Sequence, residues 1–212
     1  MTERSIRSKD QFTARSDCLY IAFYKPYGVL CQFTQPEGSN KDTLANFHLP
    51  KQVYPLGRLD FDSEGLLLLS DDANLNQALL SPKHAHERVY LVQVENIPSS
   101  AELNKLAKGV MIEGRWAAPA TVKLLQKEPV LPSRTIPIRF RKNIPTAWIE
   151  LTLIEGRNRQ VRKMTASVGH PTLRLVRLAI GSLKLFDLKL DPGQWRRLSK
   201  NEIALAFNRT GA

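Results

Sequence analysis

Three short segments of the sequence hold side chains that could act on a polar substrate. The first, residues 57–70, reads G-R-L-D-F-D-S-E-G-L-L-L-L-S and places Asp60 shortly before an apolar run at residues 66–69. A carboxylate on a loop that enters a buried strand can serve as a nucleophile or a general base, and catalytic groups often lie on such loops. Acidic residues are also ordinary in surface turns, and this segment alone favours a turn.

The other two segments supply an aromatic ring and a guanidinium group. Tyr90 lies in R-V-Y, which begins at Arg88, and Arg162 lies in E-G-R-N-R-Q-V-R-K-M, which begins at Glu155. Taken singly, a tyrosine at an alternating strand position is typical of core packing. An arginine on a helix is typical of a solvated face. Function therefore depends on whether the three segments meet.

Metal-dependent nuclease chemistry is a competing interpretation of the acidic residues. Carboxylates bind hard cations, and four aspartates lie in or just after the first segment: Asp60, Asp62, Asp71 and Asp72. Asp62, Asp71 and Asp72 also fit turn and cap positions, and His84 and His86 have no third ligand at a suitable spacing. Two cysteines are too few for a zinc knuckle or a disulfide framework. We expect no metal, no cofactor and a reducing compartment.

The overall charge points to a polyanionic partner. The 212 residues include 31 Lys and Arg against 20 Asp and Glu, a net charge of +11. Between Arg134 and Arg177 there are ten basic residues and two acidic ones, and arginine, which suits bidentate phosphate contacts, predominates. No apolar run approaches the ~20 residues that cross a bilayer, and residues 1–17 lack a signal-peptide core. Nucleic acid is favoured over a membrane, and a cytoplasmic location is expected.

The elements that must position these residues are short. Alternating or continuous apolar runs predict strands at residues 19–24, 29–33, 66–69, 88–94, 110–112, 120–125, 148–154, 173–180 and 183–185. Helical spacing and capping signals predict helices at 44–47, 74–80, from Ser99 to Gly109, from Arg159 to Val168, and from Ser199 onward. Four prolines make 126–145 an irregular surface excursion. Without regular strand–helix alternation, the order predicts an α+β protein with a mixed, mostly antiparallel sheet.

With all three segments in hand, the chain resembles the pseudouridine synthases, in particular the branch that modifies bacterial ribosomal RNA. That branch has the motifs G-R-L-D-x-x-[ST]-x-G-L-L-L-[LV]-[ST], K-x-Y and E-G-x-x-[HR]-Q-[VI]-[RK]-[RK]-M, and all three occur here in order. Arg88 stands where lysine is usual and Ser63 where threonine is common. The resemblance covers roughly residues 19–198. It implies the pseudouridine synthase fold, with helices and loops flanking the sheet and a central catalytic cleft.

The resemblance also implies a reaction and its residues. The enzyme would isomerise uridine in large-subunit (23S) ribosomal RNA, with the target base flipped into the cleft and no cofactor. Asp60 matches the essential aspartate, Tyr90 the tyrosine that stacks on the uracil, and Arg162 the basic residue paired with the aspartate. The residues implied or expected to contact RNA are Arg58, Arg157, Arg159, Lys163 and Leu175. Leu175 would pack against the uracil.

The sequence further predicts one catalytic domain over residues 19–212, made of two subdomains that share a sheet, after a disordered basic arm at residues 1–18. Only eighteen residues precede the first strand, too few for the S4-type RNA-binding domain of longer relatives. We expect a monomer with no obligate protein partner. The rival interpretations are an RNA-binding protein that keeps the fold without chemistry, and the nuclease.

Overall fold

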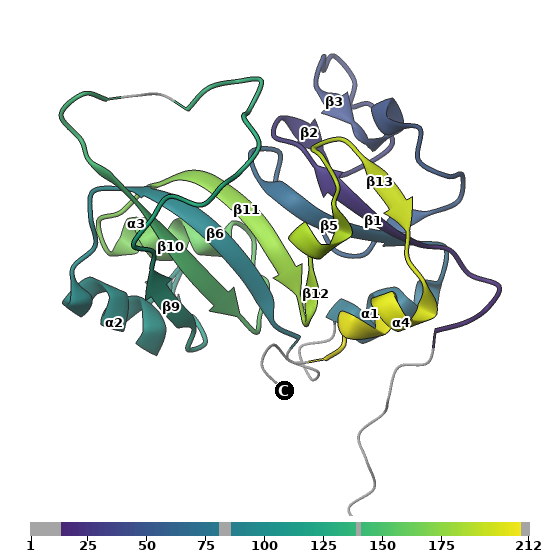
Figure 1. The fold of residues 1–212 in the computed structure, drawn as a ribbon. Helices are drawn as coiled ribbons and strands as arrows, with labels where there is room; N and C mark the ends of the chain where they lie inside the picture. The colour runs from purple at the N-terminus through teal and green to yellow at the C-terminus, as the bar shows by residue number, and fades with distance from the viewer. Residues whose placement is uncertain (1–13, 81–85, 139–140, 209–212) are drawn as a thin grey trace, which may run out of the picture.

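A single large sheet organises the molecule (Figure 1). The structure is a computed structural model that describes residues 14–80, 86–138 and 141–208. The strands are β1 Tyr20–Lys25, β2 Val29–Leu30, β3 Asp42–Thr43, β4 Tyr54–Pro55, β5 Glu64–Ser70, β6 Arg88–Glu95, β7 Met111–Ile112, β8 Arg115–Trp116, β9 Thr121–Leu124, β10 Thr146–Leu153, β11 Thr172–Ile180, β12 Leu183–Lys184 and β13 Trp195–Arg197. The helices are α1 Ala73–Leu80, α2 Ser100–Lys108, α3 Gln160–Ser167 and α4 Lys200–Leu205, with 3-10 helices η1 Leu44–Phe47 and η3 Phe186–Leu188.

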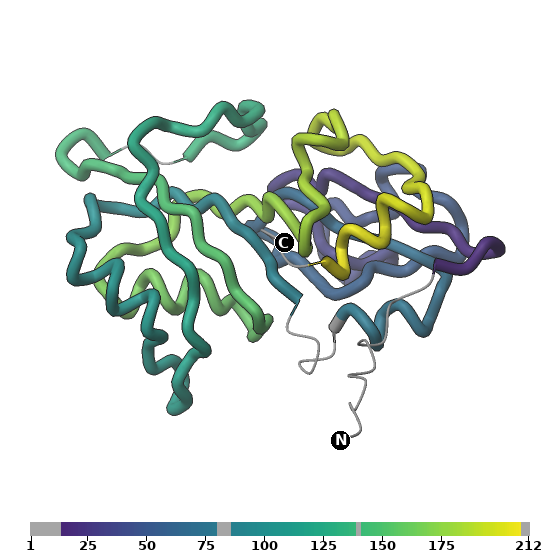
Figure 2. The backbone as a smooth tube through the Cα atoms, turned by 60° about the horizontal axis from the view of Figure 1, so that its bottom comes forward, coloured from purple at the N-terminus to yellow at the C-terminus, as the bar shows by residue number. Residues whose placement is uncertain are grey.

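The nine-stranded sheet has the order β13-β1-β5-β11-β6-β10-β9, with β12 added to β11 and β4 added to β5. Among its described strands, β5 and β11 pair in parallel and the other pairs are antiparallel. The predicted α+β class with a mixed, mostly antiparallel sheet is therefore confirmed. In Figure 2 the teal and green middle of the chain forms one half, and the purple and yellow terminal segments form the other.

Side-chain alternation divides the core between the two faces of this sheet. On one face, Leu66 and Leu68 of β5, Leu91 of β6 and Val176 of β11 form one continuous cluster, which α1 and α4 cover. The opposite face carries two separate clusters. One joins β1 and β5 to η1, and the other joins β6, β10 and β11 to α2 and α3. The interval between these two clusters lies over the parallel β5–β11 pair.

Local sequence signals explain most of the elements. All seven residues of β5 are buried, as predicted for a strand covered on both faces. Ser99 and Ser199 accept hydrogen bonds from the amides of Glu102 and Glu202, and each glutamate carboxylate accepts a hydrogen bond from the serine amide. These capping boxes begin α2 and α4 where the sequence places them.

The differences from the sequence expectations have physical causes. The strand predicted at residues 29–33 extends only over β2, because the chain turns into bends after Leu30. The polar segment β13 and the short β4 were not predicted, and they are strands because they pair with β1 and β5. In the described parts of residues 126–145 there is no helix or strand, as expected. No helix in the described residues is long and apolar enough to span a bilayer. The predicted arm falls mostly on residues 1–13, outside the described residues.

Candidate active site

A tight turn fixes the position of Asp60. Its carbonyl oxygen accepts a hydrogen bond from the Ser63 amide at 3.0 Å, which closes a four-residue turn immediately before β5. Leu59 is buried in the cluster around β1 on one side of the turn, and Ser63 is buried on the other. The Phe61 carbonyl accepts from the Gly28 amide at 2.9 Å. These contacts hold the turn rigidly. The Asp60 side chain stays 30% exposed, so its carboxylate remains open to a substrate.

The N-terminal end of α3 lies against this turn. Arg159, in a left-handed conformation at φ 51°, donates two hydrogen bonds of 2.8 Å to the Asp62 carboxylate. Its guanidinium also lies 3.8 Å from Asp60 Oδ2. Arg162, one turn further along α3, donates to the Asp62 carbonyl at 2.6 Å and to the Thr172 carbonyl at 3.4 Å. The first and third motifs thus meet in space.

The pairing inside this site differs from the one that the resemblance implies. We expected Arg162 to pair with Asp60, but Arg162 Nε lies 3.4 Å from Asp62 Oδ2, an ion pair without hydrogen-bond geometry. Asp62, which we expected to be an ordinary turn residue, is the carboxylate that both arginines hold. The reason is the geometry of the turn, which directs the carboxylate and the carbonyl of Asp62 toward the arginines of α3.

Charge and burial determine the protonation of the Asp62 carboxyl and the Arg162 guanidinium. Burial raises the pKa of the Asp62 carboxyl, but the Arg159 hydrogen bonds and the charges of Arg162 and Arg159 outweigh it and hold the pKa below its usual value. Burial lowers the pKa of Arg162, and Asp62 and Asp60 oppose that effect. Asp62 is therefore ionised at neutral pH, and it neutralises the arginines next to Asp60.

A buried lysine lies beneath the same loop. Lys25 ends β1, is fully buried, and donates to the carbonyls of Ser63 at 2.8 Å and Pro26 at 3.0 Å. Burial lowers its pKa to about 8, although nearby acidic groups, including Glu64 and Asp62, act to raise it. The ammonium group ties the end of β1 to the start of β5, so it fixes the base of the turn that carries Asp60.

Register places Tyr90 on the face of the sheet that carries α3. Gly65 of β5 pairs with Arg177 of β11, and Arg177 pairs with Tyr90 of β6. Tyr90 is half-buried and packs against the same cluster as Val92 and the α3 side chains. Leu175 is only 4% exposed and belongs to that cluster, so it is chiefly a core residue. The row from Gly65 to Tyr90 crosses the interval between the two clusters.

The other face of the site is closed by buried charges that the sequence argument missed. Arg174 donates two hydrogen bonds, of 3.0 and 2.8 Å, to the Glu64 carboxylate at the start of β5. Arg134 lies 3.7 Å from Glu64, and its guanidinium stacks 3.6 Å from the Tyr27 ring centroid. Tyr27 in turn lies beside Phe61, with ring centroids 6.4 Å apart. The excursion at 126–145 is anchored in this way to the turn that carries Asp60.

These contacts revise the expected roles of the basic residues. Arg134, Arg174 and Arg177 are buried and structural, so the basic surface is smaller than the run of ten suggests. Arg157 donates to the carbonyls of Ile112 at 2.9 Å and Trp116 at 3.3 Å, and so holds a hairpin. One feature of the sequence could have predicted these buried charges. A charged residue stands at the end of an apolar strand at Lys25, and another stands at the start of one at Glu64. Such residues are buried only with partners.

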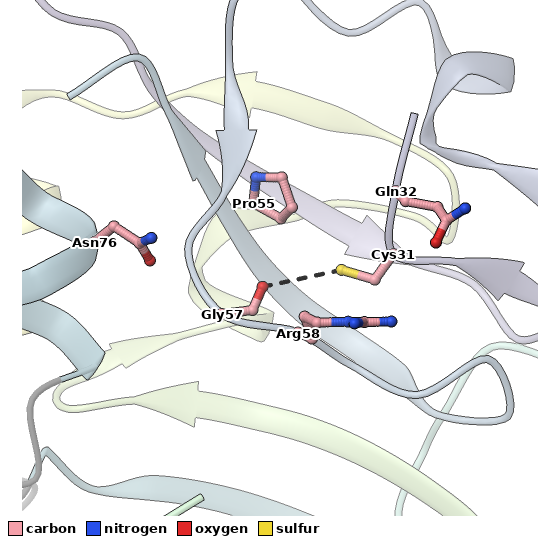
Figure 3. A pocket seen from close by; sticks show the side chains of 6 residues that line it. All are labelled: Cys31, Gln32, Pro55, Gly57, Arg58 and Asn76. Atoms are coloured by element: carbon pink, nitrogen blue, oxygen red, sulfur yellow. Dashed lines mark hydrogen bonds between the residues drawn. The ribbon is translucent and has the colours of Figure 1, made fainter. Parts of the chain in front are cut away.

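Arg58 lies two residues before Asp60 in the chain. It is exposed and lines a cavity of about 330 Å³ with Cys31, Gln32, Pro55, Gly57 and Asn76 (Figure 3). Cys31 Sγ points at the Gly57 carbonyl from 4.0 Å. Arg58 is thus close to Asp60 in sequence and open to a ligand. Lys163 is partly exposed and pairs with Glu113 at 2.7 Å.

The aspartates do not form one cluster. Asp60 and Asp62 precede β5, whereas Asp71 and Asp72 follow it, and a seven-residue strand spans roughly 20 Å. Asp71 accepts from the Leu19 amide and Asp72 from the Asn74 amide, so both are turn or cap residues. Within the described residues no group of three or more His, Cys, Asp or Glu is placed to hold a metal ion. The four carboxylates therefore do not converge as a nuclease site requires.

Comparison with known proteins identifies this arrangement. The pattern of the family described as RNA pseudouridylate synthase matches residues 19–167. A Xanthomonas campestris protein named ribosomal large subunit pseudouridine synthase E is 52% identical over 178 residues, which are 84% of this chain and 94% of that protein. A Vibrio vulnificus protein of the same name is 49% identical over 179 residues, covering 84% and 74%.

A solved structure agrees with the sequence matches. The crystal structure titled pseudouridylate synthase superposes with a TM-score of 0.73 at 28% identity, covering 90% of this chain and 74% of that one. The family pattern spans well over half of the chain and includes Asp60, Tyr90 and Arg162. The chain therefore belongs to the RNA pseudouridylate synthase family, the isomerases that convert uridine to pseudouridine in RNA.

Proposed function

We propose that this protein converts uridine to pseudouridine in large-subunit (23S) ribosomal RNA and that Asp60 is essential for the reaction. The names of relatives that are about half identical over most of the chain support this substrate. The observation that carries the proposal is the turn that holds Asp60 in the open and against the arginines of α3. Tyr90 packs against the cluster that α3 covers, on the same face of the sheet. Arg58, two residues before Asp60, is exposed and can bind a phosphate of the substrate.

The reaction needs groups that this chain can supply. The N1 glycosidic bond breaks, the uracil turns and rejoins the ribose through C5, the C5 proton leaves and N1 regains a proton. Product and substrate are isomers, so the balance requires neither oxidant nor co-reactant. Asp60 acts on the ribose or the uracil as nucleophile or in proton removal, and Tyr90 stacks on the flipped base. Leu175 lies in the core cluster against which Tyr90 packs, and its small exposed part contacts the uracil.

Asp62 and the α3 arginines have positioning and binding roles in this proposal. Arg162 acts on Asp60 through Asp62 and the turn rather than by a direct pair. Arg159 and Arg58 are exposed and contact RNA phosphates near the target, together with Lys163. Arg157 contributes by holding the neighbouring hairpin.

The organisation of the protein follows the same proposal. Residues 19–212 act as one catalytic domain of two subdomains that share the sheet, and residues 1–18 act as a basic arm. We further propose a cytoplasmic monomer that needs no obligate protein partner and no cofactor.

The decisive experiment replaces Asp60 by Asn and measures tritium release from 5-tritiated uridine in unmodified large-subunit rRNA. We expect release to be abolished while circular dichroism and RNA binding match the wild type, because the carboxylate is on an open turn. Asp71→Asn is the matched control, since Asp71 is exposed at the far end of β5. Undiminished release from the Asp60 variant would overturn the essential role of Asp60, whereas a lack of release from the wild type would favour a binding protein without chemistry.

A further inference from the structure

A small hairpin next to α3 presents two large apolar side chains to solvent. Strands β7 and β8 pair Met111 with Trp116, and these side chains are 47% and 68% exposed. Ile112 and Ala117 are buried on either side and anchor the hairpin in the core. Tryptophan is enriched at binding interfaces, where its apolar ring and its N–H group both find partners, so this exposed pair is a candidate binding surface.

The hairpin is rigid. Its two turn residues, Glu113 at φ 49° and Gly114 at φ 76°, both have the positive φ of the tight turn that matches the twist of paired strands. Arg157 donates to the Ile112 and Trp116 carbonyls, so one guanidinium links the two strands of the hairpin. Lys163 of α3 pairs with Glu113 at 2.7 Å and fixes the turn. The indole is therefore presented in a pre-organised position.

The same stretch of chain holds both this hairpin and the catalytic turn. Arg157 binds the hairpin and Arg159 binds Asp62, and their Cα atoms are at most about 7 Å apart. Arg115 is exposed beside Trp116, and Lys163 on α3 is partly exposed, with Glu113 of the hairpin turn as its ion-pair partner. Protein-binding surfaces are depleted in lysine, whereas an aromatic ring among cations is the arrangement that binds single-stranded nucleic acid.

We propose that Trp116, with Met111 beside it, is a stacking platform for an unpaired base of the RNA substrate that flanks the target uridine. The inference rests on the proposed function and adds a second base-binding position to it. The platform binds and orients the RNA while the turn at Asp60 carries out the reaction. Arg115, which is exposed beside the ring, neutralises an adjoining phosphate.

The test compares Trp116→Ala with wild type in tritium-release kinetics on unmodified large-subunit rRNA transcribed in vitro. We expect KM to rise about 5- to 100-fold, the usual cost of losing one base–aromatic stack, with kcat at saturating RNA changed less than about twofold. Trp116→Phe should keep most of the affinity. Tyr54→Ala is the matched control, because Tyr54 is 67% exposed but pairs with Ser70 at the far end of β5.

Fluorescence supplies an independent readout. Trp148 is buried and the Trp195 indole donates to the Phe47 carbonyl, so Trp116 is the most exposed of the three tryptophans. The same rRNA should quench wild-type emission, and Trp116→Phe should lose that quenching. An unchanged KM for Trp116→Ala, or quenching that survives in Trp116→Phe, would overturn the platform. A defect seen only on ribosomal particles would also overturn it and indicate a protein partner. Each of these outcomes leaves the Asp60 test intact.

Discussion

The buried lysine beneath the Asp60 turn allows a quantitative test of the structure. Lys25 has a pKa of about 8 in the folded protein against 10.5 in the unfolded chain. Between these values the unfolded chain binds more protons, so folded-state stability rises with pH. The whole shift corresponds to about 3 kcal/mol. From pH 7 to pH 9, the two pKa values give a gain of about 1.3 kcal/mol.

Lys25→Met should remove this gain. Methionine keeps the long apolar stem but has no titrating group. The unfolding free energy of the variant should therefore lack the pH-dependent contribution of Lys25. The assay is urea denaturation followed by circular dichroism at pH 7 and pH 9 for both proteins. The tyrosines whose pKa values burial raises contribute to both proteins, so their effect cancels in the difference. Cys31 and Lys25 affect each other's pKa, so Cys31→Ser is included in both proteins.

The prediction concerns the change with pH, because the level at pH 7 also contains the lost hydrogen bonds to the Ser63 and Pro26 carbonyls. Lys123→Met is the control, since Lys123 is exposed on β9 and should leave the pH dependence as in the wild type. Equal gains in wild type and Lys25→Met would refute the burial of a charged lysine beneath the turn.

Two further substitutions test the site and the sheet. Asp62→Asn should lower kcat by about 10- to 100-fold with little change in RNA affinity, because Arg159 loses its bidentate partner and the turn shifts; an unchanged kcat in tritium release, as expected for Asp71→Asn, would contradict this role. Gly65→Ala should destabilise by about 2–5 kcal/mol in thermal melts, since its φ is +108° and a Cβ would lie 2.3 Å from a β11 carbonyl oxygen. Gly169→Ala, with φ +90° and open space, isolates the backbone strain, and an equal loss there would exclude the clash.

Much of the fold follows from local signals. The continuous run in β5, the alternation in β6 and β10, and the serine–glutamate capping boxes each act within a few residues, so the sequence identifies them. The strands β4 and β13 could not be found in this way, because their stability comes from pairing with β5 and β1. Their own residues carry little strand signal.

The features of the site also fall into those that local sequence predicts and those that depend on tertiary contacts. By itself the sequence determined the cationic character of the chain, the three motifs, and the placement of Asp60 on a turn before a buried strand. Only the tertiary structure decided that Asp62 pairs with the α3 arginines. It also decided that Arg174 and Arg134 form ion pairs with Glu64. Long-range charge pairing depends on which side chains meet after strands far apart in sequence become neighbours. No local pattern encodes that choice.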